Sequence, residues 1–167
     1  MKRIWAAAIL SLPGCATLPA NSPADQWYLQ IASLCGRAWE GRLVSTDPAD
    51  AAFTGERLVM DVRHCTDHEI KIPFHVGEDR SRTWVISRTA TGLRLKHNHR
   101  HEDGSPDALT MYGGDSRGEG SGHRQELPAD AESIAMFTAQ GRSVSNGNMW
   151  AIEVGESVFA YELRRPP

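Results

Sequence analysis

The sequence predicts a mainly antiparallel β-protein with one short helix, and three observations support this prediction. Apolar and polar residues alternate with a period of two through many short runs from Trp39 onward, as expected of strands with one buried face. Glycine, asparagine and proline interrupt these runs at short intervals, which is typical of turns between neighbouring strands. One later segment, residues 132–140, has the composition of a helix. An antiparallel barrel or sandwich follows from this pattern.

The strands are identified by the side chains that share one face. Leu58, Met60 and Val62 alternate with Asp61 and Arg63 in the clearest early run, so the three apolar side chains are expected to face a core. Similar runs predict strands over residues 57–64, 69–76, 83–88, 92–101, 109–112, 124–127, 149–154 and 157–165. The last two strands are separated by a tight turn, as in a hairpin.

Two segments are candidates for helical structure. Asp130 can accept a hydrogen bond at the start of residues 132–140, and Gly141 can end that helix. Residues 27–34 are expected to form a short helix or a turn that leads into the domain. The expected helix content is therefore low.

The N-terminus carries the features of an export signal. Two basic residues precede a short apolar run, residues 4–12, which is too short to span a bilayer. The run ends in Leu-Pro-Gly-Cys at residues 12–15, and this arrangement resembles the lipobox of bacterial lipoproteins. The resemblance implies cleavage before Cys15 and stable anchoring in a membrane by acyl chains on that cysteine. The alternative is a secretory peptide that is cut nearby, for example after Ala20.

The lipoprotein resemblance also implies a location and a division of the chain. Ala16 follows the cysteine, and in similar lipoproteins the absence of an aspartate there favours the periplasmic face of the outer membrane. We expect a signal peptide over residues 1–14, a flexible tether over 15–26 and a single β-barrel domain over 27–167. The membrane is then a partner of the protein through its lipid anchor.

The net charge bears on the kind of partner that the protein can bind, and the cysteine content bears on whether it contains a disulfide. The formal net charge is −3, which gives no electrostatic reason to expect binding to nucleic acid. Two cysteines, Cys35 and Cys65, remain once Cys15 is assigned to lipidation. In an oxidising periplasm an even number of cysteines indicates a disulfide. The alternative is two separate buried thiols.

The two ends of the domain carry another pair of features. Residues 36–41 place Trp39 near the start of the first strand, and residues 160–165 place Arg164 and Arg165 near the end of the last. This pair resembles one in calycins, the lipocalin-like superfamily, where a basic side chain from the last strand packs across the indole of the first. The resemblance implies an antiparallel calycin-like β-barrel with one short helix, in which Trp39 and Arg164 lie near a bound small molecule.

One expected strand holds a distinctive polar pattern. His97, His99 and His101 share a face with Leu93 and Leu95, because side chains alternate along a strand. If the leucines face the core, the histidines continue that face toward the end of the strand. Neutral imidazoles in such a row can bind Zn²⁺ or hydrogen-bond a polar ligand. The alternative is a solvated strand end that leads into a turn.

The sequence does not favour an enzyme. Residues 114–118 satisfy the G-x-S-x-G pattern of serine hydrolases, but further glycines follow where a nucleophile elbow needs a helix. We therefore assign no catalytic residue. Three functions stay open: a membrane-tethered protein whose barrel binds a small apolar or amphipathic ligand, a metal-binding protein built on the three histidines, and a structural or interaction protein of the envelope with a packed barrel.

Overall fold

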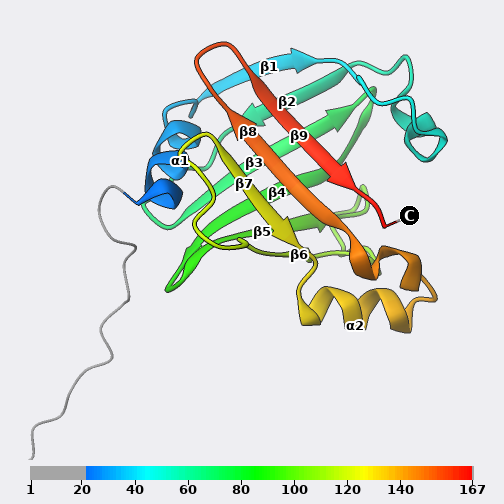
Figure 1. The fold of residues 1–167 in the computed structure, drawn as a ribbon. Coiled ribbons are helices and arrows are strands. Elements are labelled where there is room, and N and C mark those ends of the chain that lie inside the picture. The colour runs from blue at the N-terminus through cyan, green and yellow to red at the C-terminus, as the bar shows by residue number, and fades with distance from the viewer. Residues whose placement is uncertain (1–21, 167) are drawn as a thin grey trace, which may run out of the picture.

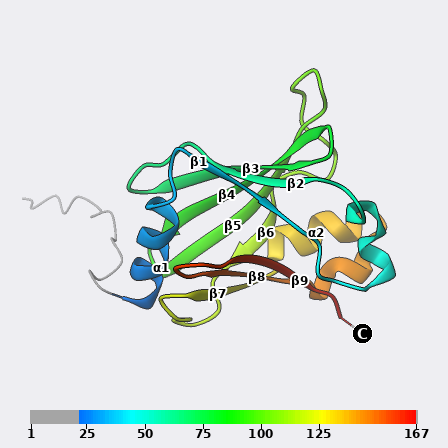
Figure 2. The ribbon, with the colours of Figure 1, turned by 90° about the horizontal axis from the view of Figure 1, so that it is seen from above.

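The computed structural model describes residues 22–166 and shows two antiparallel sheets that face each other (Figure 1, Figure 2). The first sheet, in the order β1-β2-β3-β4-β5-β6, consists of β1 (Arg37–Gly41), β2 (Leu58–Val62), β3 (Glu69–Val76), β4 (Asp79–Thr89), β5 (Gly92–His99) and β6 (Tyr112–Asp115). The second sheet, in the order β7-β8-β9, consists of β7 (Arg124–Pro128), β8 (Met149–Val154) and β9 (Phe159–Arg164). Cys15, the expected signal peptide at 1–14 and most of the expected tether lie outside the described residues.

The two sheets are not closed into the barrel that we expected. On one side β6 and β7 are in contact, since the Asp130 amide donates to the Gly113 carbonyl (2.9 Å), and a Cβ on Gly114 would collide with the Pro128 carbonyl. On the other side β1 and β9 are edge strands, and no ladder joins them within residues 22–166. A barrel needs an unbroken ladder around its circumference. The observed fold is therefore a two-sheet arrangement that is unpaired between β1 and β9.

A helix begins earlier than the sequence indicated. α1 (Pro23–Ala32) starts after Ser22, whose side-chain oxygen accepts a hydrogen bond from the Asp25 amide (3.0 Å). A proline in the first turn is favoured there because its missing N–H has no partner within a helix. Residues 23–26, which we assigned to the tether, are thus part of this helix. The helix or turn expected over residues 27–34 corresponds to the rest of α1.

The predicted later helix is present as α2 (Ala131–Ala139). Asp130 caps it as expected, because its carboxylate accepts a hydrogen bond from the Ser133 amide (2.8 Å). Gly141 follows with a φ of 67°, a conformation that glycine adopts readily. Two short 3₁₀ helices, η1 (Pro48–Phe53) and η2 (Ser143–Gly147), were not expected.

The alternation of apolar residues located most strands, although several limits differ; β4, for example, begins at Asp79 and not at residue 83. The strand expected to reach His101 ends at His99, after which Arg100 makes only an isolated bridge with Pro106. The strand expected over residues 109–112 instead begins at Tyr112. Its two glycines allow β6 to approach the backbone of β5 and β7, so packing and not side-chain alternation fixes its position.

Large side chains from both sheets and from α1 form a hydrophobic core between the layers. The least exposed are Trp27, Tyr28, Ile31, Ile70, Ile72, Ile86, Leu93, Leu95, Leu127, Trp150 and Ile152. α1 covers one end of this space, and the segment that holds η1 lies at the opposite end (Figure 2). None of the helices in the described part of the chain has the length and apolar character needed to cross a membrane.

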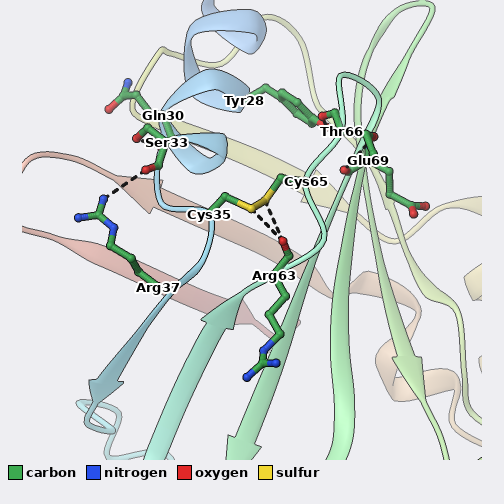
Figure 3. The surroundings of a disulfide bond; sticks show 9 residues. All are labelled: Tyr28, Gln30, Ser33, Cys35, Arg37, Arg63, Cys65, Thr66 and Glu69. Carbon is green, nitrogen blue, oxygen red and sulfur yellow. Dashed lines mark hydrogen bonds between the residues drawn. A yellow bond between two sulfur atoms is a disulfide. The ribbon is translucent and has the colours of Figure 1, made fainter.

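The predicted disulfide between Cys35 and Cys65 is present (Figure 3). It joins the turn after α1 to the segment after β2, with the two Cα atoms 6.3 Å apart. Both sulfur atoms lie near the Arg63 carbonyl oxygen. The bridge closes a loop between cysteines 30 residues apart, and closing a loop of this length stabilises a fold by ~3–4 kcal/mol in the chain-entropy account.

Candidate functional site

A row of aromatic side chains crosses the space between the sheets. This aromatic row consists of Phe53 in η1, Phe74 in β3, Trp84 in β4, and Phe159 and Tyr161 in β9. The ring centroids of Phe53 and Phe74 are 6.4 Å apart, and those of Phe74 and Trp84 are 4.6 Å apart. The Trp84 and Tyr161 rings stack at 4.4 Å. Trp84 is buried but the other four are half-buried, so aromatic surface stays accessible to solvent.

Strand register explains why the row forms. Trp84 lies opposite Ile72 on β3 and opposite His97 on β5, so all three side chains share the inner face of the first sheet. Tyr161 lies opposite the buried Ile152, which places it on the inner face of the second sheet. Planar rings from two facing sheets can then stack in offset geometry, which adds to the energy of apolar burial.

His97 is the polar centre of this region. It is 3% exposed, its Nδ1 lies 3.1 Å from the Tyr112 carbonyl oxygen, and its Nε2 lies 2.8 Å from the Tyr161 hydroxyl. A tautomer with the proton on Nδ1 satisfies both contacts: Nδ1–H donates to the carbonyl and Nε2 accepts from the hydroxyl. Burial lowers the pKa of His97 to about 3. The imidazole is therefore neutral at physiological pH and holds the Tyr161 hydroxyl in place.

The other two predicted histidines have different surroundings. His99 is half-buried, and its Nε2 lies 3.1 Å from the Tyr112 hydroxyl. Burial lowers its pKa, and the nearby positive charge of Arg82 lowers it further. His101 is exposed and lies beyond the end of β5. The expected row of three histidines is therefore reduced to two, because the chain leaves the ladder to form the turn that the Asp103 carboxylate stabilises.

The geometry does not support the predicted zinc site. Within residues 22–166, no group of three or more His, Cys, Asp and Glu side chains is placed to hold a metal ion. Both ring nitrogens of His97 already have hydrogen-bond partners within the fold. A structural zinc ion usually needs four protein ligands. The face that alternation assigned to His97 and His99 is thus held by hydrogen bonds within the fold.

Trp39 and Arg164 do not form the pair that the calycin resemblance implied. The cation over the Trp39 ring is Arg37, with its Cζ 5.0 Å from the ring centroid. Arg164 is exposed and forms ion pairs with Glu126 and Glu162. Side chains alternate along β9, and since Tyr161 faces inward, Arg164 faces outward. Trp39 remains half-buried against the core.

The connection between β1 and β2, residues 42–57, lies at the end opposite α1 and is called here the η1 loop. Phe53 attaches it to the aromatic row, and the guanidinium of Arg82 lies 5.9 Å from the Phe53 ring centroid. Arg82 belongs to the inner face of β4, two residues before Trp84, and forms an ion pair with Asp79. The sequence analysis did not predict this loop, although Asp47 followed by a proline is a pattern typical of a helix start.

Two ion pairs attach the same loop to the end of β9. Arg165 contacts Asp47 (3.0 Å) and Asp50 (2.6 Å). The hydrogen bond from Arg165 lowers the pKa of the Asp50 carboxyl below its usual value, and the Ser45 side chain contributes in the same direction. The η1 loop therefore joins strands β1, β4 and β9 at one end of the aromatic row. Sequence reasoning assigned Arg165 only to the indole of Trp39 and missed these contacts.

A separate open depression of about 250 Å³ lies on the outer side of β7. Its lining includes Arg117, Ser121 and Arg124. Arg124 is already neutralised by Glu162 (2.6 Å) and Glu153 (3.5 Å). This shallow depression has no hydrophobic or aromatic side chain in its lining, whereas most small-molecule sites are lined by such side chains. The aromatic row is therefore the stronger candidate.

Comparison with other proteins gives no family for this chain. No protein-family model, no curated protein and no solved structure matches it. The functional argument therefore rests on the chemistry of the described residues.

Proposed function

We propose that this chain is a membrane-tethered lipoprotein of the cell envelope that binds a small apolar or amphipathic ligand between its two sheets. The lipobox-like sequence that ends at Cys15 supports the tether. Ala16, in place of an aspartate after that cysteine, supports the periplasmic face of the outer membrane. The aromatic row supports the ligand class. The relation to calycins is proposed in a modified form, as a barrel-like fold that is unpaired between β1 and β9.

The half-buried aromatic row is the observation that carries this proposal. Phe74, Phe159 and Tyr161 are only half-buried, and binding sites for small molecules are lined predominantly by hydrophobic and aromatic side chains. The Tyr161 hydroxyl, fixed by His97, adds a polar group beside apolar walls, as most small-molecule sites require. Because no ladder joins β1 to β9 in the described chain, these strands can separate without breaking hydrogen bonds between them.

Binding of phenylnaphthylamine, a neutral apolar molecule whose fluorescence rises in apolar surroundings, tests the proposal. The experiment uses the unacylated chain of residues 15–167 with the disulfide intact. This chain contains all of the described residues, and it needs no detergent, which would itself bind the fluorescent molecule. We expect saturable binding to the parent protein. Phe74→Ala removes one stacked ring and should weaken binding about three- to tenfold.

Leu29→Ala is the matched control for this experiment. Leu29 is 55% exposed on α1, at the end of the molecule away from η1, so its truncation should leave binding unchanged. Thermal unfolding of each variant separates a lost contact from a lost fold. Absence of saturable binding to the folded parent protein contradicts the proposal and favours an envelope protein with a purely structural or interaction role.

The tether is tested separately from the ligand. Replacement of Cys15 by serine removes the acceptor of the acyl chains, so the protein should no longer be processed and anchored as a lipoprotein. Intact mass measurement of the parent protein from membranes should show a mature chain that begins at Cys15 and carries acyl groups. A soluble mature chain that begins elsewhere contradicts the anchor and leaves the ligand proposal standing.

A further inference from the structure

The η1 end of the molecule carries two arginines beside the aromatic row. Arg82 lies on the inner face of β4, next to Trp84 in the alternation, and its side chain is 27% exposed. Its positive charge acts on His99 and on Tyr112, where it opposes the rise that burial causes in the tyrosine pKa. Arg165 follows β9 and its side chain is 30% exposed. Cations and aromatic faces therefore meet at one end of the space between the sheets.

Two carboxylates of the η1 loop form ion pairs with one of these arginines, Arg165. Asp47 and Asp50 both contact Arg165, and the Asp50 side chain is only 16% exposed. Two oxygen anions on one guanidinium are also what a bound carboxylate or sulfonate would provide. The loop carboxylates thus stand where the anionic group of an amphipathic ligand would be recognised.

The η1 loop itself is weakly attached to the rest of the fold. No residue of η1 is buried, and Val44 in the same loop is 82% exposed. Its attachments include the two ion pairs with Arg165, the contact of Phe53 with Phe74 and the Arg82 cation over Phe53. At the end of the loop, Arg57 also forms an exposed ion pair with Glu40 of β1 and accepts a hydrogen bond from the Gly77 amide. Partly exposed ion pairs of this kind contribute little to stability, so a ligand that makes the same contacts can replace them.

We propose that the ligand is a small amphipathic anion, and that the η1 loop is a lid whose Asp47 and Asp50 occupy its charge site on Arg165 in the free protein. The apolar body of the ligand lies along the aromatic row, and its anionic group takes Arg165 when the loop carboxylates leave. Movement of Phe53 with the loop also uncovers the guanidinium of Arg82. This inference rests on the proposed function, since it names the ligand class and the regulation of the same site.

Two fluorescent molecules with one skeleton test the inference. Anilinonaphthalenesulfonate carries the ring system of phenylnaphthylamine together with a sulfonate, so the difference between their affinities reports the anionic group. Asp50→Asn and Arg165→Gln break the same ion pair and loosen the same loop. We expect Asp50→Asn to strengthen sulfonate binding by up to about fivefold, and Arg165→Gln to weaken it by a similar factor. Neither variant should weaken binding of the neutral molecule.

The opposite direction of these two changes separates charge recognition from mere loosening of the loop. Arg164→Gln is the matched control, because Arg164 is the adjacent arginine but faces outward and pairs with Glu126 and Glu162. It should change neither affinity. Competition with decanoate and decanol, which share a chain and differ in charge, extends the test to an acyl body: decanoate should displace the sulfonate more strongly.

The outcomes distinguish this inference from the function on which it rests. If the neutral molecule fails to bind the parent protein, the proposed function is wrong. If it binds but both variants shift sulfonate binding in the same direction, the loop is only a loose connection and the lid is wrong. An equal effect of Arg164→Gln and Arg165→Gln also overturns the inference, since it would reflect net charge and not the contact with the loop.

Discussion

The two ends of the space between the sheets are closed by different physical means. At the α1 end, a helix inserts Trp27, Tyr28 and Ile31, each exposed by 1% or less. The Trp27 indole N–H donates to the Ile152 carbonyl (3.1 Å), and the Tyr28 hydroxyl donates to the Thr66 carbonyl (3.1 Å). At the η1 end, none of the residues of the short helix is buried. Its loop is attached by one aromatic contact and by charged groups.

This difference predicts which end opens first. Burial of large apolar side chains contributes several kcal/mol for each residue, whereas a partly exposed ion pair contributes about 1 kcal/mol or less. The disulfide adds a covalent tie at the α1 end (Figure 3). Local opening follows the regions with the least apolar burial, so the η1 loop should open long before the fold unfolds. The α1 end is therefore the more firmly held of the two, and the η1 end is where the proposed ligand would enter.

The largest expected effect is on the stability of the α1 end. Trp27→Ala removes an indole that is 1% exposed and hydrogen-bonded, so we expect the free energy of unfolding to fall by about 3–5 kcal/mol. Phe53→Ala, the corresponding aromatic truncation at the η1 end, should lower it by about 1 kcal/mol or less, because Phe53 is half-buried. Urea unfolding measures both values. Equal losses would show that the two ends are held alike.

The sequence predicted the parts of the fold that depend on local patterns. Alternation located the strands and placed His97 on the inner face, and the Asp130 cap located α2. The two cysteines that were left once Cys15 was assigned to lipidation predicted the bond between Cys35 and Cys65. Each of these features is determined by a short stretch of sequence, or follows from the chemistry of one residue type.

The features that were missed depend on residues far apart in the chain. Tyr161 is the hydrogen-bond partner of the His97 ring although the two residues are 64 positions apart. The sequence of neither strand indicates that these two side chains meet. Whether β9 pairs with β1 depends on the placement of whole sheets, so local alternation cannot distinguish a closed barrel from an unpaired seam. His101 was misplaced because the turn that follows β5 overrides alternation. The two ends were likewise not distinguishable until α1 and the η1 loop were seen at opposite ends.

A smaller effect concerns His97, in the polar region between the two ends. The buried imidazole has a pKa of about 3, whereas its ordinary value is 6.5. The unfolded chain therefore binds a proton below pH 6.5 that the folded protein does not bind, and stability falls as the pH falls from 6.5 toward 3. At pH 5 this linkage amounts to ~2 kcal/mol relative to neutral pH.

His97→Gln isolates this contribution from that of the carboxylates. The glutamine amide can still donate and accept hydrogen bonds, but it does not titrate. Urea unfolding of parent and variant at pH 7.5 and pH 5 should show a loss of stability on acidification that is ~2 kcal/mol smaller in the variant. An equal loss in both proteins would mean that His97 is hydrated, and that the region between the ends is less tightly closed than its burial indicates.

The smallest expected change in global stability is the most direct test of the difference between the ends. Arg165→Gln removes both ion pairs to the η1 loop, so the free energy of unfolding should fall by about 1 kcal/mol or less. Hydrogen exchange of amides in residues 42–57 should nevertheless become several-fold faster, because the loop opens locally without global unfolding. Amides of α1 should exchange as in the parent protein, since their protection depends on buried side chains and not on Arg165. If protection at both ends falls together, the two ends open as one cooperative unit, and the η1 loop is not an independently moving lid.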